Sequence, residues 1–349
     1  MNRVLGCLDD KPRAKLGHTP TPLEAMPNLT AEIGGGPLYV KRDDCTGLAL
    51  GGNKVRQLEF YFGEAQARRA DTILITGAVQ SNFARLAAAA ARKLGMDCHV
   101  QHEERVAKPG TAYRESGNVL LEKMLGATLH SYPSGEDEAG ADGRLEEIAA
   151  ELEAAGRRPY IIHLAPGHPP IGALGYVDAA RELVGQMADQ DLVIDEIIVA
   201  SGSGHTHGGL LFGLRAQGCM IPVTGICVRR DAEAQRQRLV TRCHDIAKLL
   251  EIASPVAISD IRLDDRFLAP GYGLLNDPTV EAIEMAARHE ALILDPVYTG
   301  KTMAGFLQCA RDDAGEGGGG KKALLFIHTG GSPAVFGYGP SLTDALMHE

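Results

Sequence analysis

Residues 71–95 read DTILITGAVQSNFARLAAAAARKLG, and this stretch shows the unit from which the chain is built. An apolar run suited to a buried strand is followed by an alanine-rich segment suited to a helix, which Gly95 ends. Similar pairs of strand-like and helical segments recur along most of the sequence. Short apolar strands that alternate with helices predict an α/β fold whose sheets are mostly parallel and covered on both faces.

The remaining elements follow from the same pattern. Further strands are expected within residues 96–102, 127–132, 158–166, 194–204, 222–230 and 322–331, and helices near 115–125, 143–155 and 207–218. Two segments are expected to be connections: SGEDEAGADG (134–143) as a solvated loop and GEGGGG (315–320) as a flexible surface loop. Because no repeat or linker divides the sequence, any two domains should be interwoven and not arranged in series.

The composition indicates a soluble cytoplasmic protein. The 349 residues, 44% of them hydrophobic, suffice for one large domain or for two domains that share a cleft. The formal net charge of −10 argues against a nucleic-acid-binding protein, although a pocket can still attract an anionic substrate. Seven dispersed cysteines without a C-x-x-C pair suit a reducing compartment, and we expect neither a signal peptide nor a membrane span.

The turn ASGSGHTHGG (200–209) follows an apolar strand and has the composition of an anion site. Its small residues allow backbone N–H groups to converge at a helix N-terminus, which predicts a cup for one phosphate, with a plain tight turn as the alternative. A dinucleotide fingerprint fits poorly because His207 takes the place of the third glycine. His205 and His207 have no nearby third ligand, and no metal site is predicted.

Polar residues also follow the strand in the opening stretch. Gln80, Ser81 and Asn82 stand where that strand delivers side chains to the start of a helix. A helix cap accounts for one of them but not for all three. Another turn, VYTGKT (297–302), resembles a nucleotide P-loop but carries Asp295 in place of the first glycine, so a nucleotide site is rejected.

Lys54 lies in the glycine-rich stretch GGNKVRQLEF (51–60). A protonated lysine is a poor nucleophile, and burial is one way in which a protein activates it. One lysine in a glycine setting and one phosphate cup suit pyridoxal phosphate, whose aldehyde would join the lysine and whose phosphate would fill the cup. The residues alone leave open whether Lys54 is this nucleophile or a solvated cation at the start of a helix.

Six segments in the same order resemble the family of D-cysteine desulfhydrases and 1-aminocyclopropane-1-carboxylate deaminases. They are KRDDCTGLALGGNKVRQLEF, GAVQSN, ASGSGHTHGGL, APGYGLLND, DPVYTGKTMAG and FIHTGGSPAVF, and the likeness extends from about residue 16 to 340. The resemblance implies a pyridoxal-phosphate enzyme of the tryptophan-synthase-β type (fold type II) with two interwoven doubly wound domains. It also implies a large cofactor-binding domain of residues 1–54 and 166–349, a small domain of residues 55–165, and a homodimer.

The resemblance assigns roles to residues at matching positions. Lys54 matches the Schiff-base lysine that also moves the α-proton. Asn82 matches the residue that hydrogen-bonds the phenolic oxygen of the cofactor, and Ser81 a serine near the substrate carboxylate and the base. Thr329 matches the hydroxyl at the pyridine nitrogen.

Further positions complete the predicted site. Tyr272 and Tyr298 match two active-site tyrosines, with a position on the rim as the alternative for each. The predicted catalytic groups are Lys54, Ser81, Tyr272 and Tyr298. The predicted phosphate loop consists of Ser201, Gly202, Ser203, Gly204, His205 and Thr206. The predicted substrate contacts are Gln80, Ser81, Asn82, His168 and Tyr298.

Departures from the family pattern concern the substrate. Thr299 stands where the deaminases carry glutamate, which disfavours cyclopropane ring opening, and Phe83 stands where the desulfhydrases usually carry histidine. The loop APGHPPIGALGYV (165–177) carries His168 in a segment that is small and polar in the desulfhydrases. The resemblance extends to L-cysteate sulfo-lyases, and a sulfonate leaving group needs extra hydrogen-bond donors. The donors predicted for it are His168, His205, His207 and Arg114.

The leading prediction is therefore a lyase that removes the α-proton of L-cysteate and releases sulfite, pyruvate and ammonium. The alternative is a D-cysteine desulfhydrase, which releases sulfide, pyruvate and ammonium, and an aminocyclopropane-carboxylate deaminase ranks third. Two other classes stay open. One is an NADP-dependent oxidoreductase that would use residues 200–209 with Arg229 and Arg230, and the other is a non-catalytic amino-acid sensor.

Overall fold

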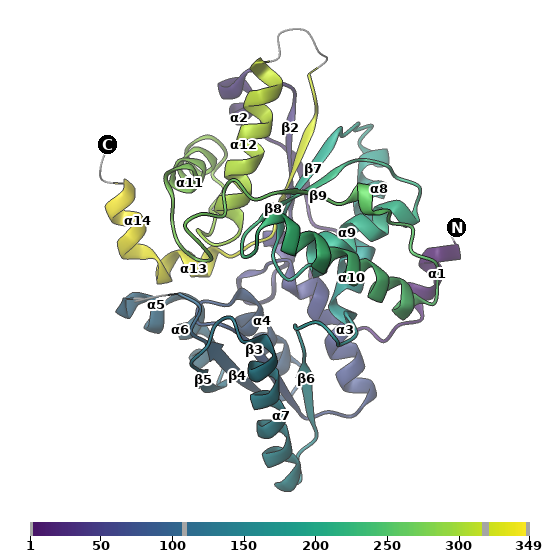
Figure 1. The fold of residues 1–349 in the computed structure, drawn as a ribbon, viewed down its shortest axis with the longest axis vertical. Helices are drawn as coiled ribbons and strands as arrows, with labels where there is room; N and C mark the ends of the chain where they lie inside the picture. Colours follow the sequence, from purple (N-terminus) through teal and green to yellow (C-terminus); the bar gives the residue numbers. More distant parts are fainter. Residues whose placement is uncertain (1–2, 107–109, 316–320, 347–349) are drawn as a thin grey trace.

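Two β-sheets organise the chain, and the computed structural model describes residues 3–106, 110–315 and 321–346 (Figure 1). The strands of the six-stranded sheet are β1 (Leu23–Ala25), β2 (Leu38–Arg42), β7 (Glu196–Ser201), β8 (Val223–Cys227), β9 (Arg262–Asp264) and β10 (Leu324–His328). The strands of the four-stranded sheet are β3 (Thr72–Ala78), β4 (Asp97–Glu103), β5 (Thr128–Tyr132) and β6 (Pro159–Ile162).

The two sheets have the strand orders β1-β2-β10-β7-β8-β9 and β5-β4-β3-β6. Every neighbouring pair is parallel except β1 and β2. The prediction of an α/β fold with mostly parallel sheets is confirmed. Each predicted strand is present, with bounds that differ from the predicted range by a few residues.

Helices connect and cover the strands. The longer ones are α3 (Lys54–Ala67), α4 (Asn82–Lys93), α7 (Glu138–Ala154), α8 (Leu174–Asp189), α9 (His205–Ala216), α10 (Ala232–Leu250), α11 (Asp277–Glu290) and α12 (Thr299–Gly315). The shorter ones are α1 (Arg3–Asp9), α2 (Pro27–Ile33), α5 (Thr111–Glu115), α6 (Gly117–Met124), α13 (Ser332–Gly337) and α14 (Gly339–Leu346). Single 3₁₀ turns are η1 (Asp43–Thr46), η2 (Leu48–Leu50), η3 (Ile171–Ala173) and η4 (Ile258–Asp260).

The segment that forms the four-stranded sheet is inserted between two strands of the six-stranded sheet. All of its strands lie between β2 and β7 in the sequence, so the chain leaves the larger sheet once and returns to it once. Figure 1 shows the larger sheet in the upper part of the molecule and the smaller sheet in the lower part. The division into residues 1–54 with 166–349 and residues 55–165 stays a prediction, which we retain as a proposal.

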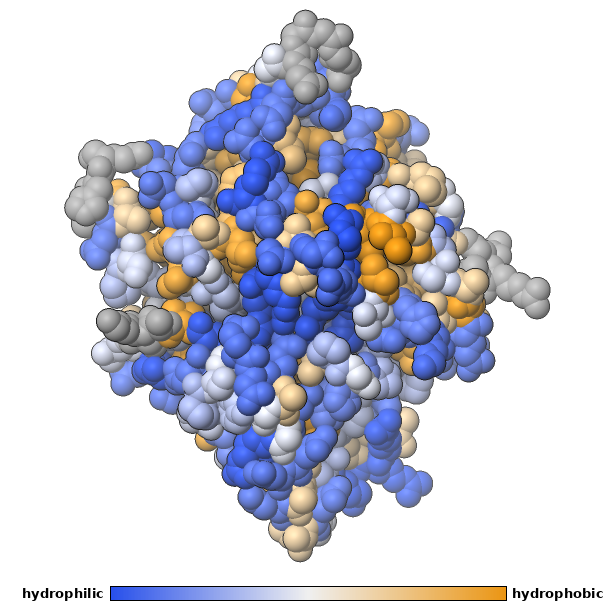
Figure 2. All heavy atoms as spheres, viewed as in Figure 1, coloured by the Kyte–Doolittle hydropathy of each residue, from blue (hydrophilic) through white to orange (hydrophobic). Residues whose placement is uncertain are grey.

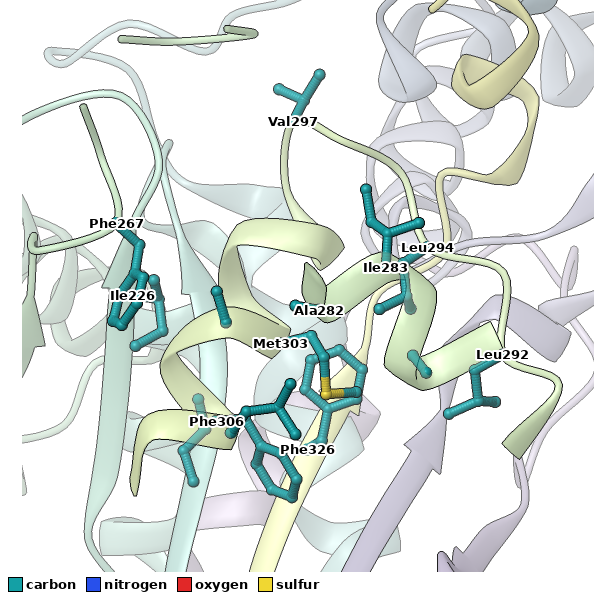
Figure 3. Close-up of a cluster of buried hydrophobic side chains, with 14 of the residues drawn as sticks. Ile226, Phe267, Ala282, Ile283, Leu292, Leu294, Val297, Met303, Phe306 and Phe326 are labelled. Carbon is teal, nitrogen blue, oxygen red and sulfur yellow. The ribbon is translucent and has the colours of Figure 1, made fainter. Parts of the chain in front are cut away.

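The six-stranded sheet is buried on both faces, as its apolar strands require. Successive residues of a strand point to opposite faces. In β10, Leu324 and Phe326 belong to the cluster packed by α11 and α12, whereas Leu325 and Ile327 pack with residues of α8 and α9. Figure 3 shows the first cluster, in which Phe306 and Phe326 lie with their ring centroids 5.7 Å apart.

A buried ionic network joins α3 to the six-stranded sheet and its helices. The Arg56 guanidinium, only 1% exposed, donates to both carboxylate oxygens of Asp43 at 2.9 and 3.0 Å and to Glu182 at 2.8 and 2.9 Å. The Tyr176 hydroxyl also donates to Asp43. Because Arg56 lies two residues after Lys54, this network fixes the start of α3.

The expectation of a solvated loop at residues 134–143 is wrong. Helix α7 begins at Glu138, and the Asp137 carboxylate caps it by accepting a hydrogen bond from the Gly140 amide at 2.9 Å. The helix begins several residues before the predicted position because the side chains of Glu138 and Asp142 point into the protein and not into solvent. Residues 316–320 of the other predicted loop lie outside the described residues.

No helix in the described part of the chain combines the length and the apolar character that crossing a bilayer requires.

The ionic network makes a prediction about stability. Replacing Arg56 with methionine leaves two carboxylates buried without their cation, and this should lower the free energy of unfolding by about 3–5 kcal/mol. Urea unfolding of the purified protein measures the change. The matched control is Arg68→Met at the C-terminal cap of the same helix, where an exposed i,i+4 pair with Glu64 should contribute little. Equal destabilisation by the two variants would contradict the role given to the network.

Candidate active site

A cavity lies between the two sheets, where strands of both end. In parallel sheets ligands bind at the carboxyl ends of the strands. The residues that line this cavity at or just after strand ends include Ala78, Glu103, Leu164, Gly202, Val228 and Thr329. Figure 2 shows hydrophilic residues gathered across the middle of the molecule, where the parts that hold the two sheets meet.

Lys54 is the first residue of α3 and lines this cavity. Its Nζ atom lies 5.1 Å from the centroid of the Phe83 ring. Burial lowers the pKa of the amine from 10.5 to about 8, and no described carboxylate offsets this shift. An amine with a pKa of about 8 is uncharged in about one molecule in ten at pH 7, far more often than an ordinary lysine.

The loop before Lys54 is fixed by backbone contacts that only a small residue permits. Gly52 has φ +128°, a conformation that favours glycine, and its N–H and C=O both hydrogen-bond the Thr46 hydroxyl, at 2.8 and 2.9 Å. The Asn53 amide donates to the carbonyl of Thr329 at 3.0 Å. The buried Arg85 guanidinium donates to two carbonyls of the same loop. The backbone that leads into Lys54 is therefore held against the end of β10.

Ser81 and Asn82 line the cavity at the start of α4. The Ser81 hydroxyl accepts a hydrogen bond from the Ala84 amide at 3.1 Å, so Ser81 is the helix cap. The side-chain oxygen of Asn82 accepts from the Asn118 side chain at 2.9 Å. Both residues therefore present fixed polar groups on the wall that also carries Phe83.

Gln80 does not line the cavity, so the substrate contact predicted for it is not supported. Its side-chain nitrogen donates to the carbonyls of Tyr113 and Ser116 at 2.6 and 2.9 Å, and its oxygen accepts from the Asn118 amide at 3.0 Å. Gln80 holds the segment around α5 and α6 in place. A run of three polar residues thus contains one scaffold residue and two cavity residues.

The turn between β7 and α9 forms a cup at a helix N-terminus. Gly202, Ser203, Gly204 and Thr206 line the cavity, and Gly204 precedes the helix with φ +88°. No described side chain caps α9, so its first N–H groups are free to bind an anion. The Thr206 hydroxyl accepts from Asn53 at 2.8 Å, which ties this cup to the loop of Lys54.

Two members of the predicted phosphate loop lie behind it. Ser201 is fully buried, and its hydroxyl contacts His207 Nδ1 at 3.1 Å and accepts from Gln235 at 2.9 Å. His205 is fully buried as well, and its Nδ1 lies 3.3 Å from the Ser203 hydroxyl. Burial lowers the pKa of His205 well below 6.5. Neither Ser201 nor His205 belongs to the cavity wall, and both support the loop from inside.

Tyr272 and Tyr298 meet in the cavity with their hydroxyl oxygens 2.7 Å apart. The buried Asp295 carboxylate accepts from the amides of Val297 and Tyr298 at 2.8 Å each and from the Thr299 hydroxyl at 2.8 Å. These bonds fix Tyr298 at the start of α12. Burial raises the pKa of the Tyr298 hydroxyl well above 10.

Three of the proposed sulfonate donors also lie away from the cavity. His168 stacks on His163 and lies 3.4 Å from Asp142, His207 is fully buried against Ser201, and Arg114 forms an exposed ion pair with Glu104. None of the three is among the residues that line the cavity. The expectation that they face a substrate is wrong in this structure, because each is engaged elsewhere.

Sequence reasoning missed a charged pair in the cavity, Glu103 and Arg105. The Arg105 guanidinium donates to both carboxylate oxygens of Glu103 at 2.8–3.0 Å and lies 5.9 Å from the Tyr272 ring centroid. The Thr76 hydroxyl also donates to Glu103 at 2.8 Å. The position of the pair at the carboxyl end of β4 was the available signal.

A second missed feature is an ionic clamp across the cavity. Glu138 of α7 accepts hydrogen bonds from Arg229 at 2.8 Å, from Arg230 at 2.5 Å and from Arg238 at 3.0 Å. The Arg238 guanidinium also donates to the carbonyl of Ser203 in the cup at 3.2 Å. The surrounding arginines lower the pKa of Glu138 to about 2 against the opposing effect of burial. The clamp ties the four-stranded part to the cup.

The residues of the cavity fit pyridoxal phosphate. The uncapped N-terminus of α9 suits its phosphate, the Lys54 amine its aldehyde, and the Thr329 hydroxyl at the end of β10 its pyridine nitrogen. Gly202 keeps the cup open, since a Cβ there would lie 3.2 Å from Val228.

Comparisons with known proteins agree with this fit. A family model described as pyridoxal-phosphate dependent enzyme matches residues 14–330. The D-cysteine desulfhydrase of Salmonella typhi is 39% identical over 333 residues, which cover 94% of this chain and 97% of that protein. A solved structure described as an ACC deaminase homologue has a TM-score of 0.85 at 36% identity and covers 99% of both chains. O-ureido-L-serine synthase, at 17% identity and a TM-score of 0.65 over 95% of this chain and 94% of its own, shares the fold.

The lowered pKa of Lys54 predicts how cofactor uptake depends on pH. Only the uncharged amine can attack an aldehyde, so the rate at which cofactor-free protein regains visible absorbance with pyridoxal phosphate should rise with pH and level off above about pH 8. Stopped-flow absorbance measures the rate, and the Lys54→Ala variant should show no recovery. A rate that keeps rising above pH 10, as for a free lysine, would contradict the effect of burial.

The clamp predicts a combined effect on stability and substrate affinity. Glu138→Gln leaves three arginines facing one another, so the protein should unfold at a lower urea concentration and KM should rise about tenfold. Because the pKa of Glu138 falls from 4.5 to about 2, its contribution to stability should be complete above about pH 4.5 and fade as the pH falls toward 2. The control is Glu136→Gln, an exposed neighbour whose carboxylate pairs with Arg229 at 3.3 Å. If Glu136→Gln lowered the stability and raised KM as much as Glu138→Gln does, the role given to the clamp would be wrong.

Proposed function

Because the chain belongs to the family of pyridoxal-phosphate-dependent enzymes, we propose that it catalyses α,β-elimination from D-cysteine, releasing sulfide, pyruvate and ammonium. The chain is a carbon–sulfur lyase of this family, as are the D-cysteine desulfhydrases to which it is similar. The observation that carries the proposal is the Lys54 amine, which lines the cavity with a lowered pKa and has no carboxylate partner among the described residues.

The bound cofactor would supply an electron sink for the negative charge that develops at the substrate α-carbon. The protein's part is proton transfer and orientation. Lys54 Nζ, with its pKa of about 8, is suited to take the α-proton near neutral pH. Ser81 and Asn82 offer polar groups for the substrate carboxylate on the same wall. The Thr329 hydroxyl would hold the pyridine nitrogen without giving it a full proton.

The two tyrosines are proposed to serve the leaving group. Their shared hydrogen bond of 2.7 Å makes one hydroxyl the donor and the other the acceptor, so the pair can present a proton to the departing sulfur. The Arg105 guanidinium lies beside this pair, 5.9 Å from the centroid of the Tyr272 ring. A thiol leaving group needs one such proton as its bond to carbon breaks.

The structure offers little support for L-cysteate. The four side chains that the sequence suggested for a sulfonate lie outside the cavity wall. The arginines that do line it are each paired with a carboxylate: Arg105 with Glu103, and Arg229 and Arg238 with Glu138. A permanently anionic tail would have to compete with these pairs. Residue 299 is a threonine and supplies no carboxylate for ring opening. Its hydroxyl donates a hydrogen bond to Asp295.

Product analysis tests the proposal. The holoenzyme should convert D-cysteine to equimolar sulfide and pyruvate, release no sulfite from L-cysteate, and leave 1-aminocyclopropane-1-carboxylate unchanged. Lys54→Ala should lower the turnover of D-cysteine by at least about a thousandfold, because it removes the group that moves the α-proton. Sulfite from L-cysteate without sulfide from D-cysteine would overturn the substrate, and turnover retained in Lys54→Ala would overturn the mechanism.

A further inference from the structure

Asp142, His163 and His168 form a cluster at the edge of the cavity, which Asp142 also lines. Asp142 lies in α7, His163 directly follows β6, and His168 lies in the segment before η3. Asp142 Oδ2 lies 3.3 Å from His163 Nδ1 and 3.4 Å from His168 Nε2. One ligand atom from each residue lies within 4.8 Å of the other two. Three potential ligand atoms from three segments thus lie close together.

Two of these atoms are buried without a hydrogen bond. Asp142 is only 6% exposed, and its Oδ2 has no hydrogen-bond partner among the described residues. His163 Nδ1 is likewise buried and unpartnered in the described structure. Buried polar atoms are nearly always satisfied in folded proteins, and each exception calls for an explanation. Here the two unsatisfied atoms face each other, which is the arrangement expected around a cation.

The donor set selects the kind of cation. Two imidazole nitrogens and one carboxylate oxygen are typical ligands of zinc and of similar divalent transition metals, with bonds of about 2.0–2.2 Å. Ligand atoms around a tetrahedral ion of that size lie about 3.4 Å apart, and the two distances to Asp142 match this spacing. A hard cation such as Mg²⁺ would require more oxygen ligands.

The two histidine rings stack with centroids 3.7 Å apart and planes 2° from parallel. In the stacked arrangement the two lone pairs do not point at one ion, and one ring has to turn. The His168 side chain, 35% exposed, has the room to do so.

We propose that Asp142, His163 and His168 bind one divalent transition-metal ion of the zinc class, with an open position for water at the exposed side of His168. The ion fastens α7 to the segment that follows β6. That segment includes Leu164 and Ala165, which line the active-site cavity together with Asp142. Binding of the metal ion therefore makes this wall of the cavity more rigid. This site is separate from the proposed elimination chemistry and does not depend on its substrate.

Metal-binding stoichiometry tests the site. Chelator-treated and dialysed holoenzyme is titrated with Zn²⁺ by equilibrium dialysis, and thermal unfolding is recorded with and without the ion. The protein should bind one more zinc per chain than the His168→Gln variant, and zinc should raise the unfolding temperature of the protein but not that of the variant. The difference between the two stoichiometries excludes zinc that free thiols such as the exposed Cys45 bind, because both proteins carry the same thiols.

A matched control is His130→Gln. His130 lies against His99 in a second histidine pair, at 3.0 Å between ring nitrogens, but that pair is not among the described groups of three potential ligands. This variant should keep the full zinc stoichiometry and the thermal shift. His163→Gln should lose both, as His168→Gln does. Equal zinc binding in the wild type and in His168→Gln, a loss in His130→Gln as well, or no zinc bound by the wild type would each overturn the site.

Discussion

The unpaired amine of Lys54 is the constraint around which the molecule is arranged. Burial destabilises the ammonium form and lowers its pKa to about 8, and the structure keeps carboxylates from restoring it. Such an amine costs stability, so the surrounding chain must hold it in place. Gly52 adopts φ +128°, Asn53 is bonded to the end of β10, and the Arg56 network anchors the next turn of α3. These contacts make the backbone on both sides of Lys54 rigid, while its amine lines the cavity.

The other buried cations show what sets Lys54 apart. Lys41 is buried against Glu182, and Arg56 is shared by two carboxylates, so both are structural groups engaged in ion pairs. Lys301 has a pKa lowered to about 8 by burial, yet its amine donates to the carbonyls of Leu268 and Gly271 and does not line the cavity. A lowered pKa therefore identifies a reactive lysine only together with access to the site.

Local patterns in the sequence predicted the fold well because the strand and helix periods are local properties. The stretch at 71–95 became β3 and α4, with Gly95 at φ +74° just beyond the helix. The polar segment at 134–143 was misread because partners nearly a hundred residues away, Arg229 and Arg238, draw Glu138 inward and make the segment helical. Gln80 and His205 were misplaced for the same reason: residue type shows that a side chain is polar, but tertiary packing decides whether it faces the cavity or supports the wall. Lys54, Ser81 and Asn82 line the cavity, and their glycine-rich and strand-end positions were a signal for this. Tyr272 and Tyr298, which only the family resemblance indicated, line it as well, and the roles of all five stay predictions.

The most direct test of the account is to identify the lysine that carries the cofactor. Borohydride reduction of the holoenzyme fixes pyridoxal phosphate to the amine that holds it, and peptide mass spectrometry then locates the modified residue. The account predicts modification of the peptide that contains Lys54 at one equivalent per chain, with Lys301 and Lys41 unmodified. Modification of Lys301 in place of Lys54, or an unmodified chain that still retains the cofactor, would contradict it.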